Sequence, residues 1–153
     1  MLDLFDGRGQ LLIYHFMFEP EADEGCPSCS LTTDNVGHLS HLHARDTSFA
    51  LVSRAPLDKL ERYRRRMGWT IPWYSSHGSD FNYDYGVSFH KEAIAEGKAL
   101  YNYKPLDFEA DELSGQSVFY KDAAGEIFHT YSVYARGDEL LIGTYNYLDL
   151  TPK

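Results

Sequence analysis

Cysteine is scarce in this sequence of 153 residues and occurs only at positions 26 and 29. Small domains often need several disulfide bonds or a structural metal, whereas a chain of this length can bury a core without them. We therefore predict one domain that spans residues 1–153.

Basic residues and long apolar segments are scarce as well. Only 14 Lys and Arg stand against 23 Asp and Glu, and the formal charge of -9 disfavours nucleic acid and anionic membrane surfaces as partners. No apolar run approaches the roughly 20 residues that cross a bilayer, and no early segment has the order of a signal peptide. We therefore expect a cytoplasmic protein. Thiols stay reduced in that compartment, so a close cysteine pair is expected to be catalytic or metal-binding.

Aromatic residues are abundant, with 12 Tyr and 9 Phe, and the sequence alternates short apolar runs with helical patterns. The runs at 10–18 and 47–53 predict buried strands, and residues 70–76 predict a third strand. Residues 29–43 and the segment from Pro56 to Gly68 predict helices, the second with an inner face made of Leu57, Leu60, Tyr63 and Met67. This order favours parallel strands joined by crossover helices.

The second half of the sequence predicts antiparallel pairing. Two alternating runs within 116–134 flank the turn Asp-Ala-Ala-Gly, which is typical of a hairpin. Residues 90–113 predict a short helix and then irregular structure. Asp138 is expected to cap a last helix whose inner face carries Leu141, Thr144, Tyr145 and Leu148. The predicted fold class is therefore α/β, with a central mixed sheet flanked by helices.

The cysteines lie in Gly-Cys-Pro-Ser-Cys, between a predicted strand and a predicted helix. A helix N-terminus lowers the pKa of a cysteine there, because free N–H groups and the positive end of the helix dipole favour the thiolate. Cys26 occupies this position, and Cys29 lies one turn further on, within reach of Cys26. The pattern predicts a dithiol in which Cys26 attacks a disulfide and Cys29 resolves the mixed disulfide.

Two other interpretations stay open. A zinc site would need both cysteines and two imidazoles from His38 and either His41 or His43. A continuous helix carries His38 about nine residues, or ~13 Å, beyond Cys29, so only a break, for example at Gly37, would assemble that site. The third interpretation is a redox-silent binding protein in which the two cysteines are small buried side chains.

Several longer motifs carry a resemblance to a known family. They are "YHFMF", "GCPSC", "FALVSRAPL", "RMGW", "PWYSSHGSDFNYDYGVSF", "SVFYKD", "FHTYSVYARG" and "TYNYLDLTP". Their order resembles the bacterial thioredoxin-like family known as domain of unknown function 899, whose members are predicted dithiol-disulfide oxidoreductases. The resemblance implies a thioredoxin-like fold of the peroxiredoxin-like kind, a protein or small-molecule thiol or disulfide as substrate, and no cofactor.

The resemblance also implies site residues and departures. Pro27 and Ser28 are expected to contact substrate beside the thiols, and alignment places Gln116 where thioredoxins carry a cis-proline, so its amide is predicted to help bind substrate. Peroxiredoxins carry Thr or Ser three residues before the reactive cysteine and Pro four residues earlier, whereas this sequence has Asp23 and Glu19, which disfavours their peroxidase mechanism. Family members usually begin with a further helix and strand, so we expect an exposed sheet edge here, which would favour a homodimer.

Overall fold

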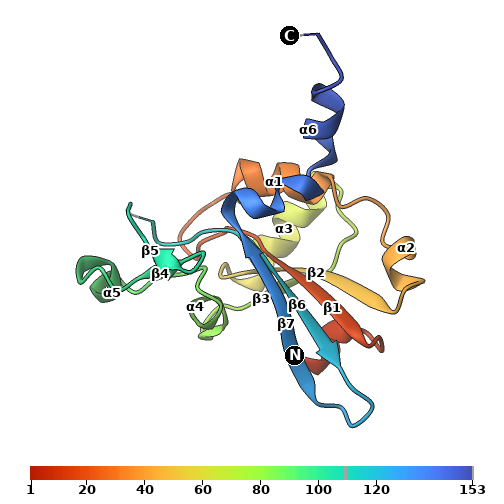
Figure 1. The fold of residues 1–153 in the computed structure, drawn as a ribbon, viewed down its shortest axis with the longest axis horizontal. Coiled ribbons are helices and arrows are strands. Elements are labelled where there is room, and N and C mark those ends of the chain that lie inside the picture. Colours follow the sequence, from red (N-terminus) through yellow and green to blue (C-terminus); the bar gives the residue numbers. More distant parts are fainter. Residues whose placement is uncertain (109, 153) are drawn as a thin grey trace.

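A computed structural model describes residues 1–108 and 110–152, which form a twisted mixed sheet with helices on both faces (Figure 1). The main sheet has the strand order β3-β2-β1-β6-β7, in which β1, β2 and β3 are parallel while β6 and β7 run antiparallel to their neighbours. Its strands are β1 (Gln10–His15), β2 (Thr47–Ser53), β3 (Trp73–Ser75), β6 (Gly115–Lys121) and β7 (Ile127–Tyr134). The short strands β4 (Leu100–Tyr101) and β5 (Lys104–Pro105) pair separately.

The helices are short, apart from one amphipathic helix. They are η1 (Leu2–Phe5), α1 (Pro27–Asp34), α2 (Ser40–His43), α3 (Leu57–Met67), α4 (Phe81–Asp84), α5 (Lys91–Ala95), η2 (Ala135–Leu141) and α6 (Gly143–Leu148). None of the helices in the described part of the chain is long and apolar enough to cross a membrane.

Each face of the sheet carries its own apolar core. On one face, Tyr14, Phe49 and Leu51 pack with Cys29 of α1 and Leu60 of α3. The other face buries a second cluster beneath η1 and α4; its core members are Phe5, Leu11, Ile13, Ala50, Val52 and Phe119. Because side chains alternate across a strand, β1 serves both cores, which is why its residues 11–14 are apolar or aromatic without a break.

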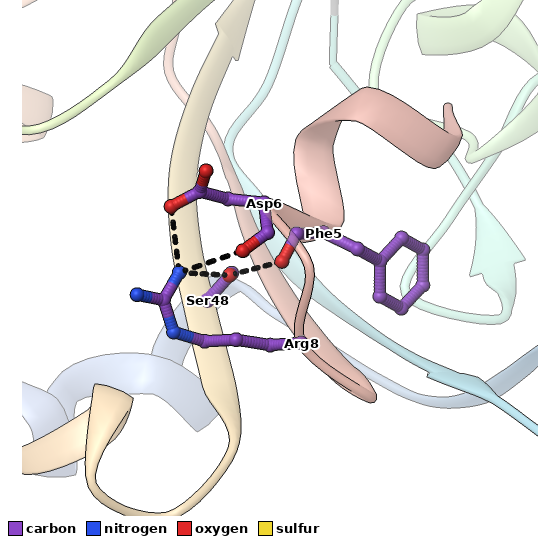
Figure 2. A network of polar contacts seen from close by, with 4 residues as sticks. All are labelled: Phe5, Asp6, Arg8 and Ser48. Atoms are coloured by element: carbon purple, nitrogen blue, oxygen red, sulfur yellow. Dashed lines mark hydrogen bonds and ion pairs between the residues drawn. The ribbon is translucent and has the colours of Figure 1, made fainter.

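Polar contacts hold η1 against the start of β2 (Figure 2). The Ser48 hydroxyl donates a 2.6 Å hydrogen bond to the carbonyl of Phe5. The Arg8 guanidinium donates to the Asp6 carboxylate at 2.7 Å and to Ser48 Oγ at 3.1 Å. These bonds hold the N-terminal segment against the face of the main sheet that lies opposite α1.

The structure confirms the mixed α/β sheet and most of the predicted elements. The strand at 47–53 is found with the predicted bounds, and Gly68 ends α3 in the left-handed conformation, at φ 71°. The hairpin turn forms as its sequence indicates, because the Asp122 carboxylate accepts bonds from the backbone N–H groups of Ala124 and Glu126, both at 2.9 Å. The strands predicted at 10–18 and 70–76 are shorter, at 10–15 and 73–75.

Three expectations about helices were wrong. The helix predicted at 29–43 is interrupted, since Gly37 adopts a φ of 72° between α1 and α2. Leu57 is exposed, because it is the first residue of α3 and the helix turns its later residues toward the core. The last predicted helix is divided into η2 and α6. Asp138 is a buried residue within η2 and does not cap a helix. The predicted inner face is exposed at Leu141, Tyr145 and Leu148.

Residues 90–113 also contain more structure than predicted. The short helix forms as α5, and the stretch expected to be irregular holds the β4–β5 pair. Position 109 of this stretch lies outside the described residues.

Candidate active site

The two cysteines lie where the chain leaves β1 and enters α1. Cys26 is the N-cap residue of α1 and Pro27 is its first residue, which costs no hydrogen bond because that N–H has no partner within a helix. The Cys26 N–H donates to the carbonyl of Met17 at 3.1 Å, and the Cys26 carbonyl accepts from the N–H of Ser30 at 3.0 Å. Both backbone groups of Cys26 are therefore fixed, and its half-buried thiol is set at the helix terminus.

Helix α3 anchors the loop that precedes Cys26. Lys59 Nζ donates to the carbonyls of Pro20 and Ala22, at 2.9 and 2.7 Å. The Tyr63 hydroxyl lies 3.1 Å from Ser30 Oγ in the first turns of α1. These contacts tie the loop and α1 to the same helix, so the position of the dithiol depends on α3.

Arg66, one of the arginines of α3, supplies one further tether. Arg66 pairs with the carboxylate of Glu24, and its guanidinium lies 4.7 Å from the centroid of the Tyr63 ring. The ion pair lowers the pKa of the exposed Glu24. One of the acidic side chains near Cys26 is thus neutralised by a cation.

The environment of Cys26 favours its thiolate. A hydrogen bond from Cys29 lowers the pKa of the Cys26 thiol to about 6, and backbone N–H groups of Cys29 and Ser28 act in the same direction, against partial burial. The two N–H groups belong to the first turn of α1 and have no partner within the helix. At neutral pH, Cys26 is therefore mostly a thiolate.

Cys29 has the opposite character. It is buried, and its contact with the neighbouring Cys26 sulfur together with desolvation raises the pKa of its thiol far above the ordinary value. The phenol of Tyr14, from the adjoining strand, interacts with Cys29 and lowers that pKa in part. The pair thus consists of an accessible thiolate and a buried, protonated thiol that donates to it.

A buried carboxyl group, that of Glu112, lies near enough to Cys26 for the two charges to interact. Glu112 is 6% exposed; its Oε1 accepts from Asn82 Nδ2 at 3.4 Å, and its Oε2 has no hydrogen-bond partner among residues 1–108 and 110–152. Desolvation raises the pKa of Glu112 to about 8, Arg54 opposes this rise, and the nearby Cys26 charge adds to it. Glu112 is therefore mostly protonated at neutral pH.

This pKa has a consequence for stability. The carboxyl group of the unfolded chain ionises near its ordinary pKa of 4.5, whereas the folded protein keeps its proton until about pH 8. The folded state therefore binds more protons between these values, and the free energy of unfolding falls as the pH rises through this window.

The predicted site residues are only partly brought together. Pro27 and Ser28 are exposed beside Cys26. Gln116 is buried on β6 opposite Tyr14, after a trans peptide bond, and lines a cavity of about 410 Å³ together with Thr32 and His41. Neither cysteine lines that cavity, so the role of Gln116 in substrate binding stays a prediction.

The ligand set of the zinc interpretation does not assemble, although the helix does break at Gly37. Among the described residues, no group of three or more His, Cys, Asp or Glu side chains could hold a metal ion. His38 instead interacts with Ser40 through Nδ1 at 2.9 Å, and His38 and His43 line a separate cavity of about 580 Å³ next to η1.

A family model identifies the protein family of this chain. The family model of the bacterial proteins of unknown function named DUF899 matches residues 1–153. The chain belongs to this DUF899 family. No curated protein matches the chain.

The DUF899 chain shares its fold with solved peroxiredoxins. A bacterioferritin comigratory protein of Xanthomonas campestris, studied for its reduction of alkyl peroxides, superposes with a TM-score of 0.59 at 12% identity, covering 92% of this chain and 78% of that protein. Peroxidoxin BcpB of Mycobacterium tuberculosis gives 0.56 at 13% identity, with 96% and 84% covered. A cysteine-to-serine mutant of peroxiredoxin Q from X. campestris gives 0.52 at 14% identity, with 91% and 80% covered. These likenesses establish the peroxiredoxin-like thioredoxin fold of the DUF899 chain.

Sequence reasoning missed several residues that shape the DUF899 site. Tyr14 looked like one aromatic of an apolar strand, and Glu112 like one acid of an irregular stretch. The sequence signal for Lys59 and Tyr63 was only helix periodicity. A side chain's role at this site depends on which segments the fold places around the cysteines, and local pattern does not contain that information.

Proposed function

We propose that this DUF899 chain is a thiol–disulfide oxidoreductase in which Cys26 is the attacking residue and Cys29 the resolving residue. The observation that carries the proposal is the asymmetry of the pair. Cys26 is half-buried at the N-cap of α1 with a pKa of about 6, while the buried Cys29 donates a hydrogen bond to it. An accessible thiolate next to a protonated partner is what disulfide exchange requires.

In the proposed reaction the Cys26 thiolate attacks one sulfur of a substrate disulfide. The substrate S–S bond breaks, a mixed disulfide forms at Cys26, and the first substrate sulfur leaves as a thiolate. That thiolate takes the proton of Cys29, whose sulfur then attacks Cys26 Sγ and releases the second substrate thiolate. The substrate disulfide gains two electrons and the Cys26–Cys29 pair becomes a disulfide. A dithiol donor returns the enzyme to its reduced form by the reverse exchange.

The exposed Pro27 and Ser28 favour a substrate that approaches from solvent as an extended surface. Neither cysteine lines the cavities of about 580, 410 and 370 Å³, whereas small-molecule enzymes usually enclose their ligand in such a cavity. A disulfide on a protein or peptide fits this arrangement better than an enclosed metabolite.

A redox titration tests the proposal. The purified protein, first analysed for metals, is equilibrated in glutathione buffers, its free thiols are alkylated, and the number of labels is counted by mass spectrometry. We expect one transition in which both thiols disappear together. If the thiols are not alkylated until a chelator removes stoichiometric zinc, the metal interpretation is supported instead. If both thiols remain open to alkylation in every buffer and form no Cys26–Cys29 disulfide, the redox-silent binding protein is supported.

A further inference from the structure

Part of the sheet face that carries α1 is uncovered. Paired residues of neighbouring strands share a face, so Val118, which pairs with Leu12, and Tyr131, which pairs with Val118, point to the same side as the α1 core. Tyr120 and Phe128 form the next pair along. Tyr131 is 58% exposed and Phe128 is 50% exposed. We name Val118, Tyr120, Phe128 and Tyr131 the hairpin face.

The C-terminal segment carries a second exposed apolar surface. The backbone N–H and hydroxyl of Thr144 donate to Asn35 Oδ1, at 2.8 and 3.0 Å, which fixes the start of α6 to the end of α1. Beyond this anchor, α6 leads away from the body of the molecule (Figure 1). The exposed apolar residues there are Tyr145, Tyr147, Leu148 and Leu150, and Leu150 is 82% exposed. We name residues 145–150 the C-terminal arm.

The arm and the hairpin face of one chain lie apart. The arm projects beyond α1, whereas the hairpin turn lies at the opposite end of the sheet (Figure 1). Packing the arm onto its own hairpin face would break both Thr144–Asn35 bonds and reverse the chain at Ile142, which is buried. A second copy can bring its hairpin face to the arm while both anchors stay intact.

We propose that the C-terminal arm of one copy packs on the hairpin face of a second copy, and that a two-fold axis makes the exchange reciprocal. Aromatic side chains bury about 150 to 250 Å² each, and those on both surfaces are about half exposed or more. The five aromatic side chains contribute about 500 Å² to each contact, and Leu148 and Leu150 of the arm add to it. Two reciprocal contacts that bury these side chains fully therefore cover up to roughly 1,500 Å², which is the size of a stable protein–protein interface. The dimer uses a sheet face and an arm, not the open sheet edge that the sequence suggested.

The assay is sedimentation velocity of the full chain over a range of concentrations. We expect a dimer for the unaltered protein. Tyr131→Asp in the hairpin face and Leu148→Asp in the arm each place a charge in the interface, so each is expected to weaken dimerisation about ten-fold or more. Leu57→Asp is the matched control, because Leu57 is also about half exposed but is the first residue of α3 and belongs to neither surface, and it is expected to leave the dimer intact.

A mixture of the two variants distinguishes exchange from other contacts. The Tyr131→Asp chain keeps its arm and the Leu148→Asp chain keeps its hairpin face, so the mixture is expected to form heterodimers through one intact contact. A monomeric unaltered chain, a dimer insensitive to either substitution, or a mixture that associates no better than its components would overturn the proposal. The thiol titration is a separate readout that these substitutions are expected to leave unchanged.

Discussion

Replacing Cys29 by alanine is expected to raise the pKa of Cys26 from about 6 toward the ordinary thiol value of about 8.5. The largest influence that lowers this pKa is the hydrogen bond from the Cys29 thiol, and alanine removes the donor. The backbone N–H groups of α1 stay in place, so the rise is expected to stop short of the full difference. The thiolate fraction at pH 7 would fall from about 90% toward about 3%.

The midpoint of the pH titration is the quantity to measure, not a rate at one pH. Intrinsic nucleophilicity rises with thiol pKa with a Brønsted coefficient of about 0.4 to 0.5, so a larger reactivity per thiolate offsets much of the loss in thiolate fraction. The alkylation rate at pH 7 would therefore change only a few-fold. The ultraviolet absorbance of the thiolate, followed against pH, reports the midpoint directly.

Cys29→Ser is the matched control, because its hydroxyl keeps a donor at the same position. We expect its midpoint to stay closer to that of the unaltered protein than the midpoint of Cys29→Ala. If Cys29→Ala titrates near pH 6 with an unchanged circular dichroism spectrum, the helix N-terminus alone sets the pKa of Cys26 and the argument from the cysteine pair is wrong.

Three further predictions concern the surroundings of the dithiol. Glu112→Gln is expected to remove the fall in stability between about pH 4.5 and 8, which amounts to up to about 3 kcal/mol at pH 7, as measured by urea unfolding across that range. Tyr14→Phe removes a hydrogen-bond partner that lowers the pKa of Cys29. Loss of one hydrogen bond of about 1 kcal/mol is expected to slow the decay of the mixed disulfide about five-fold in stopped-flow experiments. Gly25→Ala would place a Cβ 2.6 Å from the ring of Phe16 and is expected to cost about 1 to 3 kcal/mol in thermal unfolding.

Each of these predictions has a clear contrary result. Parallel stability profiles of Glu112→Gln and the unaltered protein would show that the carboxyl group does not hold its proton in the fold. Unchanged resolution in Tyr14→Phe would remove the phenol from the proposed reaction. Gly143→Ala is the control for Gly25→Ala, since the nearest atom to its new Cβ would be Asn35 Oδ1 at 3.6 Å, an ordinary contact. Equal losses in the two glycine variants would refute the packing argument.

Local sequence was sufficient wherever a backbone preference acted alone. Gly68 ends α3 because glycine accepts a positive φ, and Asp122 closes the hairpin turn through its own carboxylate. The position of Cys26 at a helix start followed from an apolar strand, a Gly-Cys-Pro sequence and a helical pattern. These features depend on residues only a few positions apart.

Local sequence failed where distant segments compete for the same residues. The apolar positions of 29–43 fit one helix, yet the chain bends at Gly37, and α2 contacts β2 instead of extending α1. Leu141 and Leu148 have the spacing of an inner face, but they fall on the separate helices η2 and α6, and both side chains are about half exposed. Periodicity shows that a face is apolar and does not show what covers it.

The sequence by itself determined the alternation of strands and helices, the hairpin and the place of the Cys26–Cys29 pair at a strand–helix junction, because each arises from steric and hydrogen-bonding preferences of neighbouring residues. Only the tertiary structure decided that the Cys29 thiol is buried beside Tyr14, that α3 holds the loop before Cys26, and that Glu112 lies unsolvated near the thiolate. A pKa depends on desolvation and on charges brought close by folding, and these contacts join residues up to about a hundred positions apart.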